Sequence, residues 1–255
     1  MVSRSSAASG IALEICVESP AGAAAAIAGG CDRIELCSAL ALGGLTPSAG
    51  LVAQVLAITR PARVPVRAMV RPRTGQFDYQ VDDLALAVAE ARALIDAGVQ
   101  GLVFGATEGA RLDVEALRAW VAALRPDRPP LTLHRAIDVV ADPVAAVDEA
   151  VALGFDHVLT SGGAVSAPEG VETIAAMVAG AAGRCTIMAG AGVVPGNVAS
   201  LVARTGVGAV HGSASDPAPA GVDRWGFGPM PRQTSAATVA ALRRAIDDQS
   251  NLRQM

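Results

Sequence analysis

Short apolar runs recur along this chain at nearly regular intervals, and each is followed by an alanine-rich stretch of helical composition. The eight runs lie at 11–16, 33–37, 64–70, 101–106, 131–137, 157–162, 185–190 and 208–213. Their mean spacing is about 28 residues, the length of one strand-plus-helix unit. Eight such units predict an α/β protein with a single (β/α)8 barrel of the TIM type. A doubly wound open sheet is the alternative, although the stretch ESPAGAAAA after the first run is not its Gly-rich turn.

The expected helices carry their own start and stop signals. An N-cap residue followed by proline predicts three helix starts, at Ser19–Pro20, Thr46–Pro47 and Asp142–Pro143. Glycine predicts four helix ends, at Gly29, Gly98, Gly154 and Gly206. We expect a flexible tail over 1–10, one barrel domain over 11–255, a Pro/Gly-rich loop at 216–233 and a last helix over about 235–248.

Composition excludes several classes of protein. Hydrophobic residues make up 52% of the chain, but much of this is alanine and no run reaches the 18 or so residues of a membrane span. A net charge of −4 and 3% aromatic residues argue against nucleic acid as a partner. The first ten residues lack the apolar core of a secretory signal, so we expect a cytoplasmic protein with reduced cysteines.

Two of the runs place a glutamate and a cysteine two residues apart. Glu14 and Cys16 share one face of the first strand, and Glu35 and Cys37 share one face of the second. A carboxylate pointing into the helix layer would be costly unless it were paired, so both pairs are expected inside the barrel. The cysteines would then follow the glutamates one layer higher, on neighbouring strands.

Other polar residues are expected at the carboxyl ends of the strands, where barrel enzymes hold their active sites. The acid–base and electrostatic candidates are Glu14, Glu35, Arg71, His134, Asp138 and His211. Glycine-rich turns follow the seventh and eighth runs, and such turns either bind an anion or simply reverse the chain. The anion-binding candidates are Arg71, Arg73, Gly190, Gly192, Gly212 and Ser213.

The two strand-end cysteines are also candidate metal ligands. Cys16 and Cys37 offer the soft thiolates that Cu(I) prefers, although free cysteine is also a common small core residue, and a disulfide between the two is a further alternative. Cys31 and Cys185 come before or at the start of their strands, so they are expected at the opposite end of the barrel.

Eight stretches of the sequence, in order, resemble the CutC family of copper homeostasis proteins. They are LEICVES, DRIELCSALALGGLTPS, VRPRTGQFDY, GLVFGA, LTLHRAID, HVLTSGG, IMAGAGV and VHGSAS, over roughly residues 11–215. The resemblance implies a cytoplasmic barrel protein that handles Cu(I) through Cys16 and Cys37 and self-associates into dimers or tetramers. Thr74, Gln76, Ile137 and Cys31 depart from the residues usual in that family.

Three hypotheses follow for the function. The first is a Cu(I)-binding protein of copper homeostasis. The second is an enzyme, an isomerase or lyase, or a binding protein for a small anionic metabolite, phosphorylated or not. Because no lysine lies in the eight strand-end stretches, Schiff-base chemistry is disfavoured. The third is a scaffold that acts through the 216–233 loop at an oligomer interface.

Overall fold

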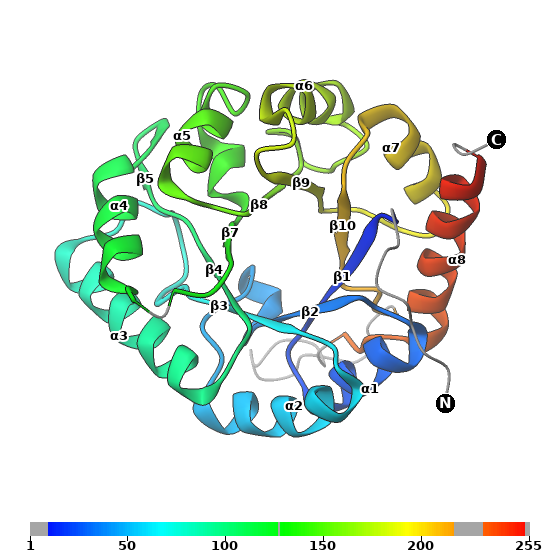
Figure 1. The fold of residues 1–255 in the computed structure, drawn as a ribbon, viewed down its shortest axis with the longest axis horizontal. Coiled ribbons are helices and arrows are strands. Elements are labelled where there is room, and N and C mark those ends of the chain that lie inside the picture. The colour runs from blue at the N-terminus through cyan, green and yellow to red at the C-terminus, as the bar shows by residue number, and fades with distance from the viewer. Residues whose placement is uncertain (1–9, 127, 217–231, 253–255) are drawn as a thin grey trace, which may run out of the picture.

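Eight parallel strands close into a barrel surrounded by helices in the computed structural model (Figure 1). The structure describes residues 10–126, 128–216 and 232–252. In barrel order the strands are β1 (Ala12–Val17), β2 (Arg33–Leu36), β3 (Val66–Met69), β4 (Gly101–Phe104), β7 (Leu131–Leu133), β8 (His157–Thr160), β9 (Thr186–Ala189) and β10 (Ala209–Gly212). Pairing of β10 with β1 closes the ring, so the predicted barrel is confirmed and the open-sheet alternative is wrong.

The helices follow the strands in alternation, with short irregular elements added at the carboxyl ends of the strands. They are α1 (Pro20–Gly29), α2 (Ala49–Ala62), α3 (Val81–Ala97), α4 (Val114–Ala123), α5 (Ala146–Leu153), α6 (Val171–Ala181), α7 (Val198–Thr205) and α8 (Ala236–Leu252). The additions are 3-10 turns η1 (Leu40–Leu42) and η2 (Arg135–Val139) and a hairpin of β5 (Thr107–Glu108) and β6 (Arg111–Leu112). In the described part of the chain, no helix is both long and apolar enough to cross a membrane.

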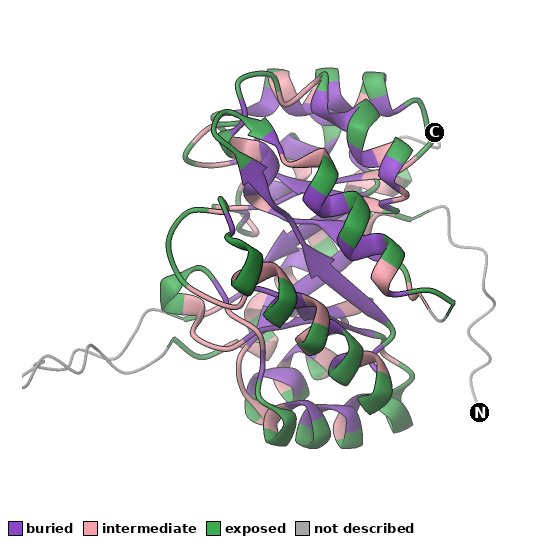
Figure 2. Ribbon diagram, turned by 90° about the vertical axis from the view of Figure 1, so that its left-hand side faces the viewer, coloured by how far each residue is buried: buried purple, intermediate pink, exposed green. Residues whose placement is uncertain are grey.

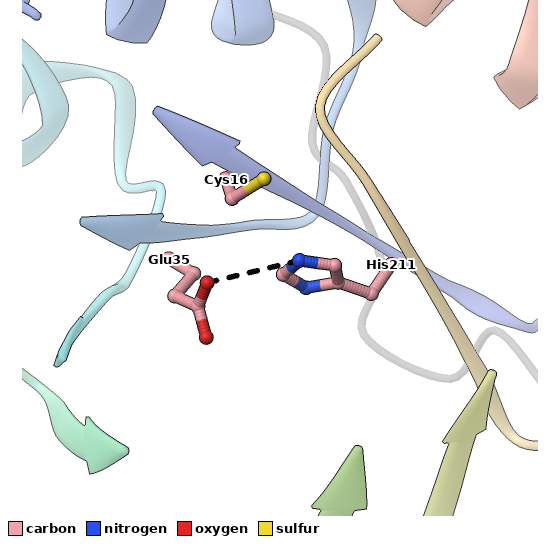
Figure 3. A group of neighbouring side chains, drawn as sticks. All are labelled: Cys16, Glu35 and His211. Carbon is pink, nitrogen blue, oxygen red and sulfur yellow. Dashed lines mark ion pairs between the residues drawn. The ribbon is translucent and has the colours of Figure 1, made fainter. Parts of the chain in front are cut away.

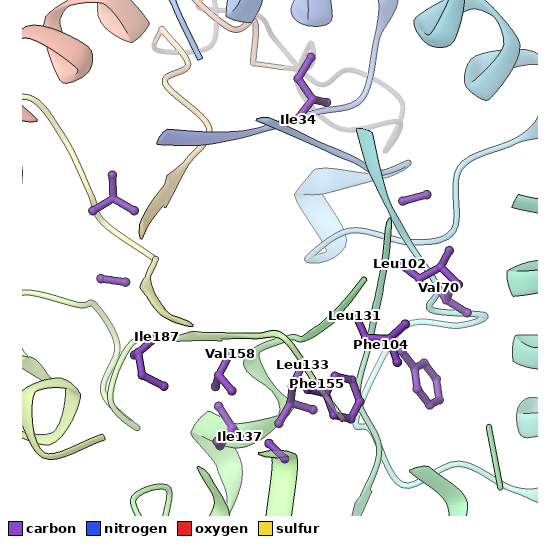
Figure 4. Close-up of a cluster of buried hydrophobic side chains, with 14 of the residues drawn as sticks. Ile34, Val70, Leu102, Phe104, Leu131, Leu133, Ile137, Phe155, Val158 and Ile187 are labelled. Carbon is purple, nitrogen blue, oxygen red and sulfur yellow. The ribbon is translucent and has the colours of Figure 1, made fainter. Parts of the chain in front are cut away.

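The main hydrophobic core lies between the barrel and its helices. Alternate strand residues point outward into this layer, where side chains such as Leu102, Phe104 and Leu133 are fully buried (Figure 4). The helices bury the sides that face the strands and expose their outer sides (Figure 2). Because this layer provides the apolar burial, the inner face of each strand is left free to carry polar residues.

Three helix boundaries differ from the predictions. Helix α2 is capped by Ser48, whose hydroxyl accepts a hydrogen bond from the Leu51 amide at 3.3 Å. The Thr46 hydroxyl instead donates to Glu90 at 2.6 Å and accepts from the Arg71 amide at 2.8 Å. Asp142 does accept from the Ala145 amide, but this closes a turn and α5 begins only at residue 146.

Helix α1 ends one residue later than predicted. Gly30, with φ of 89°, takes the left-handed cap conformation, and Gly29 belongs to the helix. A Cβ at position 29 would overlap the side chain of Val239, so this glycine allows α1 to pack closely on α8. The glycine stops at 98, 154 and 206 and the Ser19 cap are confirmed. The predicted tail at 1–10 and loop at 216–233, with Trp225 and Phe227, fall almost entirely outside the described residues.

Candidate functional site

A cavity of about 560 Å³ opens at the carboxyl ends of the strands, and we call it the barrel mouth. Cys16, Glu35 and His211 line one side of it, and Arg71 and His134 line another. All of these residues except Arg71 belong to the inward-facing set of a strand or follow it directly. The two groups of polar residues therefore share one cavity.

Strand register explains why three residues distant in sequence converge. In the ladder, Glu14 pairs with His211 across β1 and β10, and Cys16 pairs with Glu35 across β1 and β2. The ligand atoms of Cys16, Glu35 and His211 all lie within 4.8 Å of one another (Figure 3). We call these three residues the mouth cluster.

The imidazole of His211 is held between two carboxylates. Its Nδ1 donates a hydrogen bond to Glu14 at 2.8 Å, and its Nε2 lies 3.7 Å from a Glu35 carboxylate oxygen (Figure 3). Burial lowers the pKa of His211, but Glu35, Cys16 and Glu14 outweigh it and raise that pKa well above its ordinary value. The Glu14 contact fixes the ring so that Nε2 faces the rest of the cluster.

Glu14 is completely buried beneath His211 and carries the charge that orients it. Burial would raise the pKa of Glu14, but the hydrogen bond from His211 and the charge of Arg33 together lower it to about 2. Arg33 Nε donates directly to Glu14, while its guanidinium also contacts His157 Nε2 at 3.2 Å and Met188 sulfur at 3.4 Å. This ion pair forms the floor under the mouth cluster.

Glu35 has one carboxylate oxygen without a hydrogen-bond partner in the described structure. Burial raises its pKa, which nearby His211 lowers only in part and Glu14 raises further. The thiol of Cys37 donates to its other oxygen at 3.5 Å. A buried carboxyl with a free oxygen beside an imidazole can move a proton or contribute to a cation site.

Cys37 does not belong to the mouth cluster. We expected the two cysteines in one layer above both glutamates, but the register sets Cys16 level with Glu35, and Cys37 lies two residues farther along the chain, directly after β2. The stagger of strands that a closed barrel requires accounts for this offset. Cys37 packs against Met69 and Val103, and burial followed by the charge of Glu35 raises its pKa well above the usual value.

On another side of the mouth, His134 and Arg71 meet at Phe77. The His134 ring lies 4.7 Å from the Phe77 ring, and the Arg71 guanidinium carbon lies 5.3 Å from the centre of the same ring. The Ala136 amide donates to His134 Nδ1 at 3.1 Å, which leaves the proton of the neutral ring on Nε2. Burial, assisted by the charge of Arg71, lowers the pKa of His134 to about 3.

Two predicted site residues have structural partners instead. Arg73 forms an ion pair with Asp83 at 2.8 Å and donates to the carbonyl groups of residues 74, 76 and 78, so it organises that loop. Asp138 accepts from the Thr160 hydroxyl at 2.5 Å, from Arg135 and from three groups of residues 161–163. The structure does not place either residue among those lining the mouth.

Thr160, the last residue of β8, is turned towards the helix layer. Its hydroxyl lies 3.7 Å from the Met177 sulfur of α6, while its neighbour Leu159 lines the mouth. Strand alternation accounts for the difference, because Leu159 and His157 hold the inward positions of β8.

The glycine-rich loops after β9 and β10 do border the mouth. Gly192, Gly212 and Ser213 line it, whereas Gly190 is needed for packing because a Cβ there would lie 2.5 Å from Leu159. Ala191 and Ala214 adopt left-handed conformations, with φ of 72° and 44°. Non-glycine residues rarely adopt this conformation, so both loops hold strained backbone at the edge of the mouth.

Sequence reasoning missed two residues below the cluster, Arg33 and His157. Arg67 donates to Thr132, and Arg33 joins Glu14 to His157. The signal was available, since Arg33 has the same parity as Glu35 and therefore points inward. Cys31 and Cys185 lie at the opposite end of the barrel, as expected, and burial raises the pKa of Cys31 to about 12.

The comparisons with known proteins agree on one family. The model of the CutC family matches residues 11–216. Family proteins named CutC from Caulobacter vibrioides (strain NA1000 / CB15N) and Rhizobium meliloti (strain 1021) are 47% and 45% identical to this chain. These alignments cover 92% and 93% of the chain and 97% and 96% of the two relatives.

A solved structure agrees with these relatives. The crystal structure of the proposed copper homeostasis protein CutC from Streptococcus agalactiae superposes with a TM-score of 0.75 at 31% sequence identity. The superposition covers 80% of this chain and 98% of the Streptococcus chain. The barrel fold is therefore shared with that protein.

Proposed function

Because the chain belongs to the CutC family of copper homeostasis proteins, we propose that it binds Cu(I) in the barrel mouth, with Cys16 and His211 as ligands. The observation that carries the proposal is the hydrogen bond from His211 Nδ1 to Glu14. Histidines that bind metals commonly donate their second ring nitrogen to a carboxylate, which fixes the ring and strengthens its donor atom. In this protein that contact leaves Nε2 facing Cys16 and Glu35.

The donor set suits a soft cation. A thiolate and an imidazole are favourable ligands for Cu(I), whereas a carboxylate is a harder ligand that suits Zn²⁺ or Mn²⁺ better. Cys16 is 9% exposed and lines the mouth, so an ion can reach its sulfur from solvent. We assign Glu35 the role of compensating charge beside the ion rather than that of a principal ligand.

Protons compete with copper at this site. The pKa of His211 is raised by Glu35 and Cys16, so the metal-free ring holds a proton on Nε2 that the ion must replace. The Cys16 thiol must lose its proton as well. Affinity should therefore rise with pH until both groups are deprotonated.

Cys37 is a second thiol close to the cluster, 3.5 Å from Glu35. Its raised pKa disfavours the thiolate form before an ion arrives. We propose that Cys37 is not required for the first copper ion, in contrast to the pairing of Cys16 and Cys37 that the family resemblance implies.

An anaerobic titration of the reduced protein with Cu(I) against a competing chelator tests this assignment. The wild type should take up one equivalent tightly, and Cys16→Ser or His211→Gln should lower the affinity about a hundredfold or more. Cys37→Ser should change it by less than about tenfold. Cys185→Ser, which alters a thiol at the opposite end of the barrel, is the matched control. Unchanged binding in Cys16→Ser would exclude the site.

The proposal also includes the cellular location and the oligomeric state of the protein. The described structure leaves all four cysteines as free thiols, which suits the reducing cytoplasm. We propose a cytoplasmic homo-oligomer, and light scattering of the purified protein measures its assembly. A monomer over the working concentration range would contradict the proposed homo-oligomer.

A further inference from the structure

We infer that the barrel mouth also binds a small organic anion, a phosphate or carboxylate group held between Arg71 and His134 on the side away from the mouth cluster. This anion site is separate from the copper ligands and does not depend on a metal being bound. Its support comes from a buried charge without an ionic partner, a donor without a hydrogen-bond partner, and the volume and lining charge of the cavity.

Arg71 is a buried cation with no anionic partner among the described residues. Its two terminal nitrogens donate to the carbonyl groups of Leu42, Gly44 and Gly75, at 2.8 to 3.0 Å, and its Nε has no hydrogen-bond partner. The nearby Tyr79 hydroxyl adds no charge, because burial raises its pKa to about 12. An arginine that is only 6% exposed and lacks a carboxylate partner is uncommon unless a ligand supplies the charge.

His134 supplies an unpartnered donor beside this cation. It is 3% exposed, and its Nε2 has no hydrogen-bond partner in the described structure. The opposite edge of the ring faces backbone, because Ala136 donates to Nδ1 and a Cβ on Gly105 would lie 2.7 Å from that edge. His134 lines the mouth, and its Nε2 is the ring nitrogen that no described residue satisfies.

Arg71 and His134 lie close together, because both contact the Phe77 ring. An anion within reach of both would receive one charged and one neutral donor, and the aromatic ring would cover its apolar part. The cavity of about 560 Å³ exceeds what a single ion needs, so it can accept an organic molecule that carries the anionic group.

The overall charge of the mouth favours the same class of ligand. Arg71, Arg135 and Arg232 line it, with Arg135 already paired with Asp138, whereas Glu35 is the one carboxylate among its described lining residues. This cationic lining belongs to a chain whose net charge is −4. A cavity whose sign opposes that of the whole molecule attracts anions selectively.

The three histidines of the chain allow a direct test, because each gives a separate imidazole signal in ¹⁵N-histidine NMR spectra. Metal-free wild-type protein, kept with a chelator at constant ionic strength, is titrated with inorganic phosphate and, separately, with malonate. We expect a saturable shift of the His134 Nε2 signal with either probe, while His157 at the floor of the barrel stays unchanged. A shift with phosphate alone would identify the anionic group as a phosphate, and a shift with malonate alone would identify it as a carboxylate.

Substitutions of Arg71 test whether its charge binds the anion. Arg71→Gln should weaken the binding about tenfold or more, and Arg71→Lys should weaken it less, because it keeps the charge. Arg111→Gln is the control, since Arg111 is 81% exposed and outside the mouth. The wild-type titration decides the proposal even if Arg71 variants disturb the loop. No saturable shift up to the order of tens of millimolar, or equal shifts at all three histidines, would overturn it. The His211 signal reports copper binding and the His134 signal reports anion binding. Failure of one proposal therefore leaves the other intact.

Discussion

His211 and His134 lie in the same barrel mouth, are both buried, and have opposite protonation states. Burial lowers the pKa of each, but Glu35, Cys16 and Glu14 raise the pKa of His211 well above its ordinary value. His134 has the cation Arg71 beside it, and its pKa falls to about 3. The comparison shows that neighbouring charges, not burial, divide the mouth into a side that can exchange a proton for a metal and a side that donates a neutral hydrogen bond.

The largest effect should come from removing the carboxylate that orients His211. Glu14→Gln leaves Arg33 buried without its ionic partner, and we expect a loss of about 3–5 kcal/mol in the free energy of unfolding. Denaturant unfolding measures this loss. The matched control is Glu172→Gln, which breaks an exposed pair with Arg204 and should cost less than about 1 kcal/mol. Equal effects from the two variants would show that the ion pair under His211 adds nothing to stability.

The opposite pKa shifts also predict opposite dependences of stability on pH. The pKa of His134 is lower in the folded state than in the unfolded state, so the unfolded chain binds an extra proton between pH 6.5 and 3. Its share of the free energy of unfolding should fall by about 4 kcal/mol as pH drops through that range. The pKa of His211 is higher when folded, so its share is complete below pH 6.5 and declines as pH rises above it.

Denaturation at a series of pH values separates the two histidines. The difference in unfolding free energy between the wild type and His134→Phe should shrink as pH falls from 6.5 to 3. A difference that stays constant over this range would mean that His134 titrates normally in the folded protein.

Close packing on the His134 side gives a smaller predicted effect. In Gly105→Ala the new methyl group would lie 2.7 Å from the His134 ring and 2.9 Å from Ala136, so we expect a loss of about 1–3 kcal/mol and a displaced ring. Gly50→Ala in α2 is the control, because nothing lies within 4 Å of the added methyl group, and it should stabilise by about 0.5–1 kcal/mol. Thermal or denaturant unfolding distinguishes the two signs. If Gly105→Ala left the free energy of unfolding unchanged, the His134 ring would be free to move.

The inward placement of Glu14, Cys16 and Glu35 could be predicted from sequence, because strand periodicity and the cost of burying a carboxylate both point the same way. Their mutual arrangement could not, since Glu14 and His211 are separated by 197 residues and meet only when the barrel closes. The stagger of that closure sets Cys16 level with Glu35 rather than with Cys37 and brings it close to His211.

Other residues were misplaced because regular periodicity ends with the strand. Asp138 lies in a 3-10 turn after β7, where the alternation of two no longer applies, and it binds the amide groups of a neighbouring loop. The lowered pKa of His134 likewise depends on Arg71, which belongs to a different strand end. Such contacts depend on tertiary structure rather than on any local pattern.

The smallest predicted effect concerns the charge that distinguishes the two histidines. Glu35 is the largest of the influences that raise the pKa of His211, so Glu35→Gln should lower that pKa. The pKa of His134 should not change, because Glu35 is not among its influences. Imidazole ¹⁵N shifts followed against pH report both rings in one sample. If both values moved together, the two sides of the mouth would be coupled, and copper and anion could not be treated as independent ligands. If only His211 moved, the loss of its proton would make copper binding less dependent on pH in the variant than in the wild type.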